Sequence, residues 1–127
     1  MASIDPFKSN FKRFVHSFRF AWHGIVATIK SEVNFRFHLL ATVIVIMAGI
    51  YFHIRLFEWM MIVFLIGGML ALELMNTAIE RVVDLVTQQH HPLAKKAKDA
   101  GAAAVFVFAV VSVIIGLCIF LPKLTFL

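Results

Sequence analysis

Apolar residues recur along the chain with two different spacings, and each spacing predicts a different kind of helix. Between residues 7 and 31 they recur every three or four positions, which places them on one face of a helix: Phe7, Phe11, Phe14, Phe18, Trp22, Ile25 and Ile29. Lysines, arginines and histidines occupy much of the rest of this segment. We therefore predict an amphipathic helix over about residues 7–31 that lies on a membrane surface. A helix packed on a soluble core is the alternative interpretation.

Three later segments are almost continuously apolar. They cover about residues 36–54, 57–78 and 100–121, and their lengths match the ~17–25 residues of a membrane-spanning helix. A polar segment at about 81–98 separates the last two. These segments predict an all-α integral membrane protein with three transmembrane helices, organised as one domain over residues 1–127.

The composition supports this fold class. Hydrophobic residues make up 61% of the 127-residue chain, against about 45–50% in soluble domains, and so small a domain cannot bury them all in its own core. The net charge of +5 does not indicate nucleic-acid binding, because too little polar sequence remains to build a basic face. A single cysteine, Cys118, excludes an intrachain disulfide.

The twelve lysines and arginines predict the orientation of the chain. Six precede the first predicted span, one lies between the first and second, four lie between the second and third, and one follows the third. Cytoplasmic loops of membrane proteins are enriched in Lys and Arg. We therefore expect the N-terminus and the segment 81–98 to lie in the cytoplasm.

Four of the seven acidic residues fall between residues 73 and 99. Glu73, Asn76, Glu80 and Asp84 follow one another at i, i+3, i+7 and i+11, so they share one face of a helix. We call these four residues the polar face. Glu73 lies near the end of the second predicted span, where an ionisable group costs about 2.5–3.5 kcal/mol on insertion scales and usually serves a function.

Carboxylates that cluster beside cations suit a hard metal ion and phosphate groups. Mg²⁺ commonly binds one or two carboxylates together with substrate phosphates, and Glu32, Glu80 and Asp84 are the candidate ligands. Lys98 and the N-terminal arginines can neutralise phosphate charge. Glu73, deeper in the membrane, is placed to accept a proton from a hydroxyl group. The pattern predicts phosphoryl transfer, although the chain contains no GxxxxGK[ST] loop and no GxGxxG motif.

A small proton-coupled transporter subunit is the alternative function from another class, because such proteins also use an intramembrane glutamate. That function predicts a glutamate near the bilayer midplane and no cytoplasmic segment rich in Asp and Lys. Here Glu73 lies near the cytoplasmic end of its span, and the sequence AKKAKDAG follows at residues 94–101. A non-catalytic membrane scaffold gives no reason for the polar face. The pattern therefore favours a kinase.

The run ELMNTAIERVVD at residues 73–84, followed by AKDAGAAAV at residues 97–105, resembles the prokaryotic diacylglycerol kinase family. These are small integral-membrane lipid kinases that include undecaprenol kinases. WHG at residues 22–24 and EVNFR at residues 32–36 extend the resemblance over nearly the whole chain. It implies a homotrimer in the bacterial inner membrane, with a surface helix on each three-span subunit and with active sites shared between neighbouring subunits. It also implies transfer of the γ-phosphate of ATP to a lipid alcohol, assisted by Mg²⁺.

The resemblance further assigns roles by position. Glu73 corresponds to the catalytic base of the family and Asn76 to an active-site amide beside it, while Asp84 occupies an acidic position of the motif. Glu32 and Glu80 correspond to the metal-binding carboxylates. The positions that correspond to nucleotide contacts are Arg13, Glu32, Glu80, His91, Lys98 and Asp99.

The choice of lipid alcohol follows from finer details of the resemblance. NTAIE at residues 76–80 and HPLAK at residues 91–95 are closer to the undecaprenol kinases of Gram-positive bacteria. We therefore expect undecaprenol as the acceptor, with diacylglycerol as the alternative. Four residues depart from the best-known members, which carry Tyr, an acidic residue, Glu and Ser at the positions of Phe20, His38, Gln89 and Ala102. These departures bear on lipid specificity more than on activity.

Overall fold

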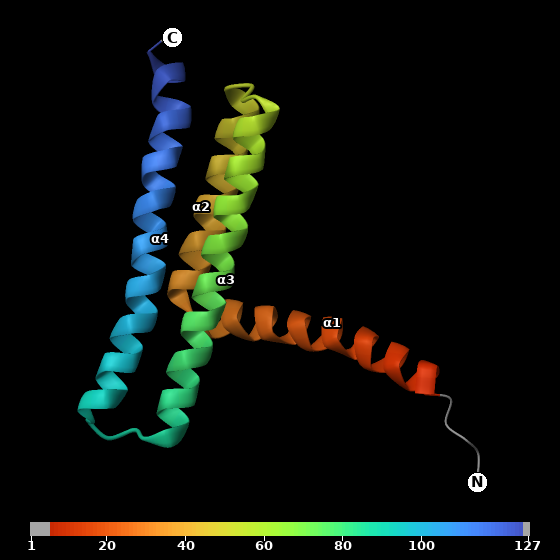
Figure 1. Cartoon of the computed structure of the whole chain (residues 1–127). Helices are drawn as coiled ribbons and strands as arrows, with labels where there is room; N and C mark the ends of the chain where they lie inside the picture. Colours follow the sequence, from red (N-terminus) through yellow and green to blue (C-terminus); the bar gives the residue numbers. More distant parts are fainter. Residues whose placement is uncertain (1–5, 126–127) are drawn as a thin grey trace.

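The computed structural model describes residues 6–125, which form four helices (Figure 1). They are α1 (Pro6–Ser31), α2 (Val33–Tyr51), α3 (Leu56–Val86) and α4 (Pro92–Leu124). Side chains are described from Ser9 onwards, so the first residue of the predicted aromatic stripe, Phe7, lies outside the described side chains. The prediction of an all-helical chain is confirmed.

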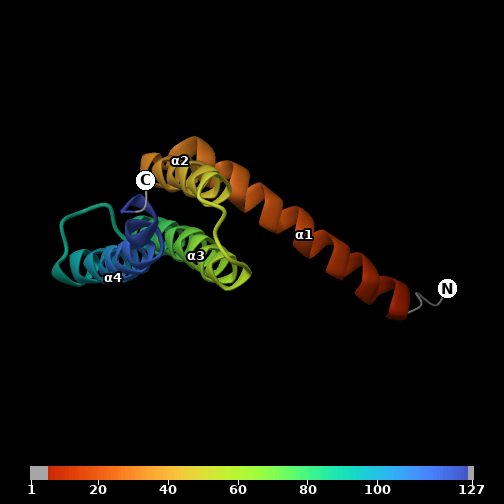
Figure 2. The same cartoon turned by 90° about the horizontal axis from the view of Figure 1, so that it is seen from above.

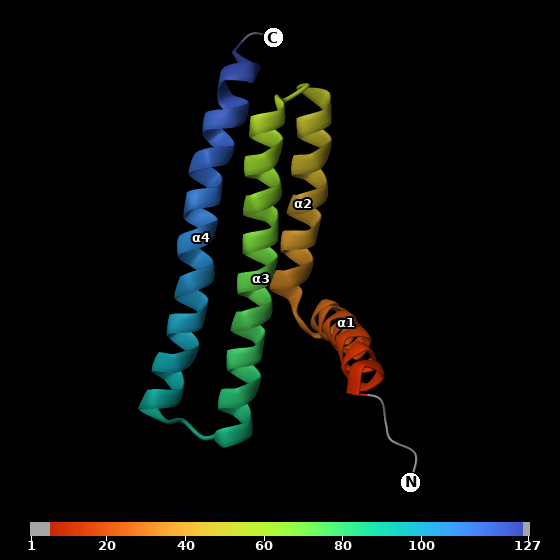
Figure 3. The ribbon, with the colours of Figure 1, turned by 45° about the vertical axis from the view of Figure 1, so that its right-hand side comes forward.

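The central helix is α3. Both α2 and α4 pack against it, whereas α1 leaves the start of α2 and runs away from the other three helices (Figures 2 and 3). About a third of the residues in the most apolar window of α3 are buried (33%), against 11% in α2 and 6% in α4. The polar face therefore lies on the helix that is best covered by the rest of the chain.

The helix ends follow local sequence signals. Pro92 is the first residue of α4, a position where its missing N–H costs no hydrogen bond, and the His91 side chain accepts a hydrogen bond from the Leu93 backbone N–H. At the start of α3 the Glu58 carboxylate accepts a hydrogen bond of 2.7 Å from the Arg55 backbone N–H. Glu32 has extended backbone angles, and this single residue turns the chain from α1 into α2.

Little of the apolar surface is buried within the chain. The buried cluster consists of Ile54, Ile62 and Ile119, with partly buried neighbours such as Trp59. Most of the large apolar side chains of α2 and α4 are exposed, and α2, α3 and α4 are each long and apolar enough to cross a membrane. This is the surface expected of helices that are surrounded by lipid.

The helices differ from the predicted spans at their ends. The predicted polar segment 81–98 is mostly helical, because α3 continues to Val86 and α4 already begins at Pro92. The prediction placed the limits where hydrophobicity ends, but the Ala, Lys, Glu and Arg residues of this segment are strong helix formers. The α2 helix runs over 33–51 rather than 36–54, since the chain turns after Tyr51 and returns Ile54 to the core.

Candidate active site

The polar face runs from a buried to an exposed position along α3. The exposed fraction is 3% for Glu73 and 9% for Asn76, whereas Glu80 is half-buried and Asp84 is exposed. The stacking predicted from the spacing is therefore present on one helix, and its inner half is shielded by the neighbouring helices. The polar face thus has a buried carboxylate at one end and is open to solvent at the other. This arrangement suits a reaction between a membrane-embedded substrate and a water-soluble substrate.

Asn76 and Glu80 form a direct contact on this face. The Asn76 side-chain Nδ2 donates a hydrogen bond of 3.0 Å to the Glu80 carboxylate. The other amide atom, Asn76 Oδ1, is buried and has no hydrogen-bond partner among the described residues. A buried acceptor without a partner is uncommon and calls for a specific explanation.

The Glu73 residue is buried, and its carboxylate has no polar partner among the described side chains. Among the side chains of residues 9–125, none forms a hydrogen bond or an ion pair with it. The adjacent Thr77 does not fill this role, because its hydroxyl donates to the Glu73 backbone carbonyl at 3.0 Å. Glu73 is thus a desolvated carboxylate whose oxygens remain available as proton acceptors.

The corner between α1 and α2 is bound to α3 beside the polar face. Arg81 donates a hydrogen bond of 2.8 Å to the Ser31 hydroxyl, and its guanidinium lies 4.0 Å from the Glu32 carboxylate. The Ser31 hydroxyl in turn donates to Glu32 at 3.0 Å. These contacts hold Glu32 against α3 one residue beyond Glu80. The structure therefore places Glu32 beside Arg81, the residue that follows Glu80 on α3.

The exposed end of the polar face is joined to α4. Lys98 donates a hydrogen bond of 2.5 Å to Asp84, and this carboxylate raises the pKa of the Lys98 ammonium above its ordinary value. Asp99 makes no contact with α3 of this kind and pairs with Lys95 on its own helix, also at 2.5 Å. Of the neighbouring residues Lys98 and Asp99, therefore, only Lys98 forms a described contact with a residue of the polar face.

Two predicted nucleotide contacts are not gathered with the others within one chain. Arg13 is exposed and lies on the half of α1 that projects away from the bundle (Figure 1). His91 caps α4, and its Nδ1 is occupied by the hydrogen bond from the Leu93 backbone N–H. Among the described residues no three His, Cys, Asp or Glu side chains lie close enough together to enclose a metal ion.

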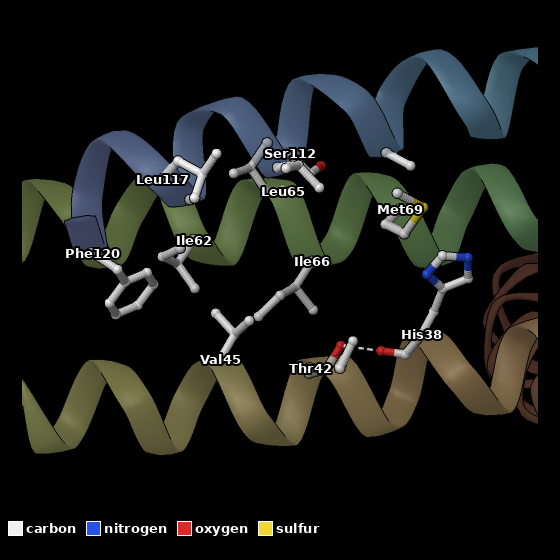
Figure 4. Close-up of a pocket in the computed structure, with 14 residues that line it drawn as sticks. His38, Thr42, Val45, Ile62, Leu65, Ile66, Met69, Ser112, Leu117 and Phe120 are labelled. Atoms are coloured by element: carbon white, nitrogen blue, oxygen red, sulfur yellow. Dashed lines mark hydrogen bonds between the residues drawn. The ribbon is translucent and has the colours of Figure 1, made fainter. Parts of the chain in front are cut away.

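Two hollows lie along α3, one beside the polar face and one further towards the start of the helix. The first, of about 340 Å³, lies between α1 and α3 and is lined by Ala21, Gly24, Ile25, Thr28, Leu74, Thr77, Ala78 and Arg81. The second is an apolar groove of about 420 Å³ on α3 between α2 and α4 (Figure 4). In Figure 4 the His38 side chain extends from α2 towards Met69 of α3 at one end of the groove. Met69 lies one helical turn from Glu73, so the groove leads towards the polar face.

Reasoning from the sequence missed the role of Arg81. It assigned no partner to this residue, but Arg81 contacts Ser31 and Glu32 in the structure, while Asp84 contacts Lys98. The available signal was the position of Arg81 directly after Glu80, which is too general to identify a partner 50 residues away.

Comparisons with known proteins identify the family of the chain. The sequence model of the family described as prokaryotic diacylglycerol kinase matches residues 19–120. The undecaprenol kinase of Bacillus subtilis (strain 168) is 56% identical over 117 residues, which cover 92% of this chain and 95% of that protein. The diacylglycerol kinase of Synechocystis sp. is 42% identical, over 85% of this chain and 62% of that protein. The diacylglycerol kinase of Escherichia coli (strain K12) is 27% identical, over 84% of this chain and 87% of that protein.

Proposed function

The chain belongs to the prokaryotic diacylglycerol kinase family and is a lipid kinase, and from this premise we propose that it phosphorylates undecaprenol with ATP as the donor. The observation that carries the choice of acceptor is the identity of 56% with an undecaprenol kinase, against 42% and 27% with two diacylglycerol kinases. Diacylglycerol is the alternative acceptor, because the family is named after it. Because the chain belongs to a family of kinases, the alternative of a proton-coupled transporter subunit is set aside.

Glu73 acts as the general base in this proposal. The hydroxyl oxygen of the lipid attacks the γ-phosphorus while the bond from that phosphorus to the β–γ bridging oxygen breaks, and ADP leaves. The hydroxyl proton passes to the Glu73 carboxylate. The proposal is supported by the burial of Glu73 at 3% exposure and by the lack of a polar partner among the described side chains, since a base must be free to accept a proton.

Glu80 and Glu32 are the proposed Mg²⁺ ligands. The donor set fits this ion, because Mg²⁺ usually takes one or two carboxylates and completes its shell with phosphate oxygens and water. Glu80 accepts a hydrogen bond from Asn76, and Glu32 lies beside Arg81. These two carboxylates are enough for such a site, so no third protein ligand is required. When bound, the ion neutralises negative charge on the phosphates. Asn76 orients Glu80 through the hydrogen bond of 3.0 Å.

The nucleotide is proposed to lie on the exposed side of the polar face. Lys98 is the best-placed cation, because its pairing with Asp84 holds it at the end of the face. Asp99, His91 and Arg13 are assigned to nucleotide binding by resemblance to the family. Arg13 and the buried carboxylate are not adjacent within one chain, which supports an active site completed by a second subunit.

We propose that the enzyme is a multi-pass protein of the bacterial inner membrane with its N-terminus in the cytoplasm. The exposure of large aromatic side chains on α1 supports an interfacial position. At least 60% of the surface is exposed in each of Phe11, Phe14, Phe18 and Trp22. Such a helix gains free energy by burying this face in the headgroup region. The end that bears Glu80, Asp84 and Lys98 then faces the cytoplasm, where ATP is available.

The proposed assembly is a homotrimer with shared active sites. The wide exposure of apolar side chains on α2 and α4 is compatible with contacts to lipid and to further copies of the chain. Chemical cross-linking in native membranes is expected to yield a trimer as the largest product. Mixing Glu73→Gln with Arg13→Ala should give more activity than either variant alone if one site draws Glu73 and Arg13 from two subunits.

A competition assay tests the acceptor. The purified protein in mixed micelles receives labelled ATP, Mg²⁺ and equal amounts of undecaprenol and diacylglycerol, and the phosphorylated lipids are separated. We expect undecaprenyl phosphate to dominate. Dominant phosphatidic acid would replace undecaprenol by diacylglycerol as the acceptor. If an active control enzyme works in the same micelles and this protein yields no phosphorylated lipid, the proposed function is wrong.

A further inference from the structure

Gly101 of α4 lies where no side chain fits beside the polar face. The residue is buried, and a Cβ atom built on its backbone would lie 2.5 Å from Asn76 Oδ1 and 3.6 Å from Ile79 Cδ1. A separation of 2.5 Å is far inside van der Waals contact. A side chain at position 101 would therefore require the Asn76 amide to move.

The surroundings of Gly101, and not its cost to the helix, set it apart from the other glycine in the apolar part of α4. In the interior of a helix every residue except proline is more favourable than glycine. Gly116 of the same helix has no atom within 4 Å of a built Cβ, so it shows that α4 also carries glycine without close packing. Gly101 differs because its missing side chain leaves room for one particular group, the Asn76 amide.

The orientation of that amide is fixed from two sides. The Glu80 carboxylate only accepts hydrogen bonds, so the Asn76 Nδ2 must face it, and Oδ1 must then point the opposite way. Oδ1 points at the backbone of Gly101 and has no hydrogen-bond partner among the described residues. A Cβ at position 101 would force the amide to rotate, and any rotation takes Nδ2 away from Glu80.

We propose that Gly101 is a positioning residue, whose lack of a side chain holds the Asn76 amide in the orientation that orients Glu80. The inference rests on the proposed roles of Asn76 and Glu80 in the kinase reaction. It adds a residue on α4 that touches neither lipid nor nucleotide but sets the geometry of a proposed Mg²⁺ ligand. Outer partners that orient metal ligands typically alter metal affinity by about 10–100-fold when they are changed.

Three alanine variants separate positioning from packing. Gly101→Ala places a methyl group against Asn76. Gly68→Ala places one against the Phe108 ring, in the same α3–α4 interface but away from the polar face, and Gly116→Ala meets nothing. We expect Gly101→Ala to raise the Mg²⁺ concentration for half-maximal rate by about tenfold. Gly68→Ala should lower the unfolding temperature without this shift, and Gly116→Ala should change neither.

A double-mutant cycle with Asn76→Ala tests whether the effect passes through the amide. Residues in contact give non-additive effects, so Gly101→Ala should lower the unfolding temperature in the parent and at most half as much in the Asn76→Ala background. If Gly101→Ala alone does not fold, Asn76→Ala/Gly101→Ala should fold, because the clash has been removed. Failure of both to fold overturns the inference.

The inference is also overturned if Gly101→Ala shifts the Mg²⁺ dependence no more than Gly68→Ala does, or if the two sites are additive in stability. The stability cycle is measured without substrate. An absence of lipid phosphorylation by the parent protein would therefore refute the proposed function and still leave the contact between Gly101 and Asn76 to be judged separately.

Discussion

Two glutamates of α3 have different surroundings: Glu58 lies near the start of the helix and Glu73 in its interior. At the far end, which we define as Arg55, Glu58, Trp59 and Lys123, the Glu58 carboxylate accepts a hydrogen bond of 2.7 Å from the Arg55 N–H. It also lies 3.2 Å from the Lys123 ammonium. In the interior of α3, Glu73 is more deeply buried, yet none of the described side chains forms a hydrogen bond or an ion pair with its carboxylate.

Packing differs in the same direction. The far end adjoins the buried cluster of Ile54, Ile62 and Ile119, whereas the polar face contains a buried acceptor, Asn76 Oδ1, that has no hydrogen-bond partner among the described residues. Polar groups whose hydrogen bonds are complete help to hold a fold together. Buried groups left incomplete are costly and usually persist for a function. The comparison separates Glu58, whose carboxylate has polar partners, from Glu73, the proposed general base on the same helix.

The largest expected effect comes from replacing the two glutamates, Glu73 and Glu58, one at a time by glutamine. Glu73→Gln should lower the rate of lipid phosphorylation by about 10²–10⁴-fold, because the general base is lost. Glu58→Gln is the matched control and should keep at least half of the parent rate. Nucleotide binding and the oligomeric state should survive in both variants. A Glu73→Gln enzyme that retains more than about a tenth of the parent rate would remove Glu73 as the base.

Next in size are the proposed metal ligands. Glu80→Gln and Glu32→Gln should each raise the Mg²⁺ requirement by about 10-fold or more, and high Mg²⁺ should partly restore the rate. Titration of the initial rate against Mg²⁺ at fixed ATP measures this shift. An unchanged Mg²⁺ requirement in both variants, with a lower maximal rate, would assign these carboxylates to another role.

A smaller effect is expected from the lysines of α4. Lys98→Met removes the cation paired with Asp84 and should raise the KM for ATP by about tenfold, as expected for the loss of one charged contact to phosphate. Lys95→Met is the control, because Lys95 pairs with Asp99 away from α3. Equal effects of the two substitutions on KM would point to general surface charge instead of a specific contact.

The smallest effect on activity should come from a substitution in the buried apolar cluster that adjoins the far end. Ile119→Ala removes a buried side chain from the apolar cluster and should lower the free energy of unfolding by about 2–5 kcal/mol. Below the unfolding transition, kcat/KM should stay within twofold of the parent value. Denaturation in detergent and initial rates measure the two quantities, and a large loss of kcat/KM in the folded variant would show that the two ends are coupled.

Some features of the site follow from sequence because they depend on local geometry. The spacing of Glu73, Asn76 and Glu80 places them on one face of any helix. Their shared face therefore follows from the sequence once the segment is helical. The apolar runs predicted three long helices for a similar reason, since a bilayer needs a fixed length of apolar chain. Helix ends such as Val86 and Pro92 were less accessible, because polar residues can continue a helix as readily as apolar ones.

The sequence by itself determined the fold class, the family and the order of the polar face, because helical periodicity and motif wording are properties of neighbouring residues. It did not determine which distant residues meet. The contacts of Arg81 with Glu32, of Lys98 with Asp84, and of Asn76 with Gly101 join separate helices. Only the packing of α1, α2 and α4 on α3 decided them, because the position where two helices touch depends on side-chain fit along their whole length.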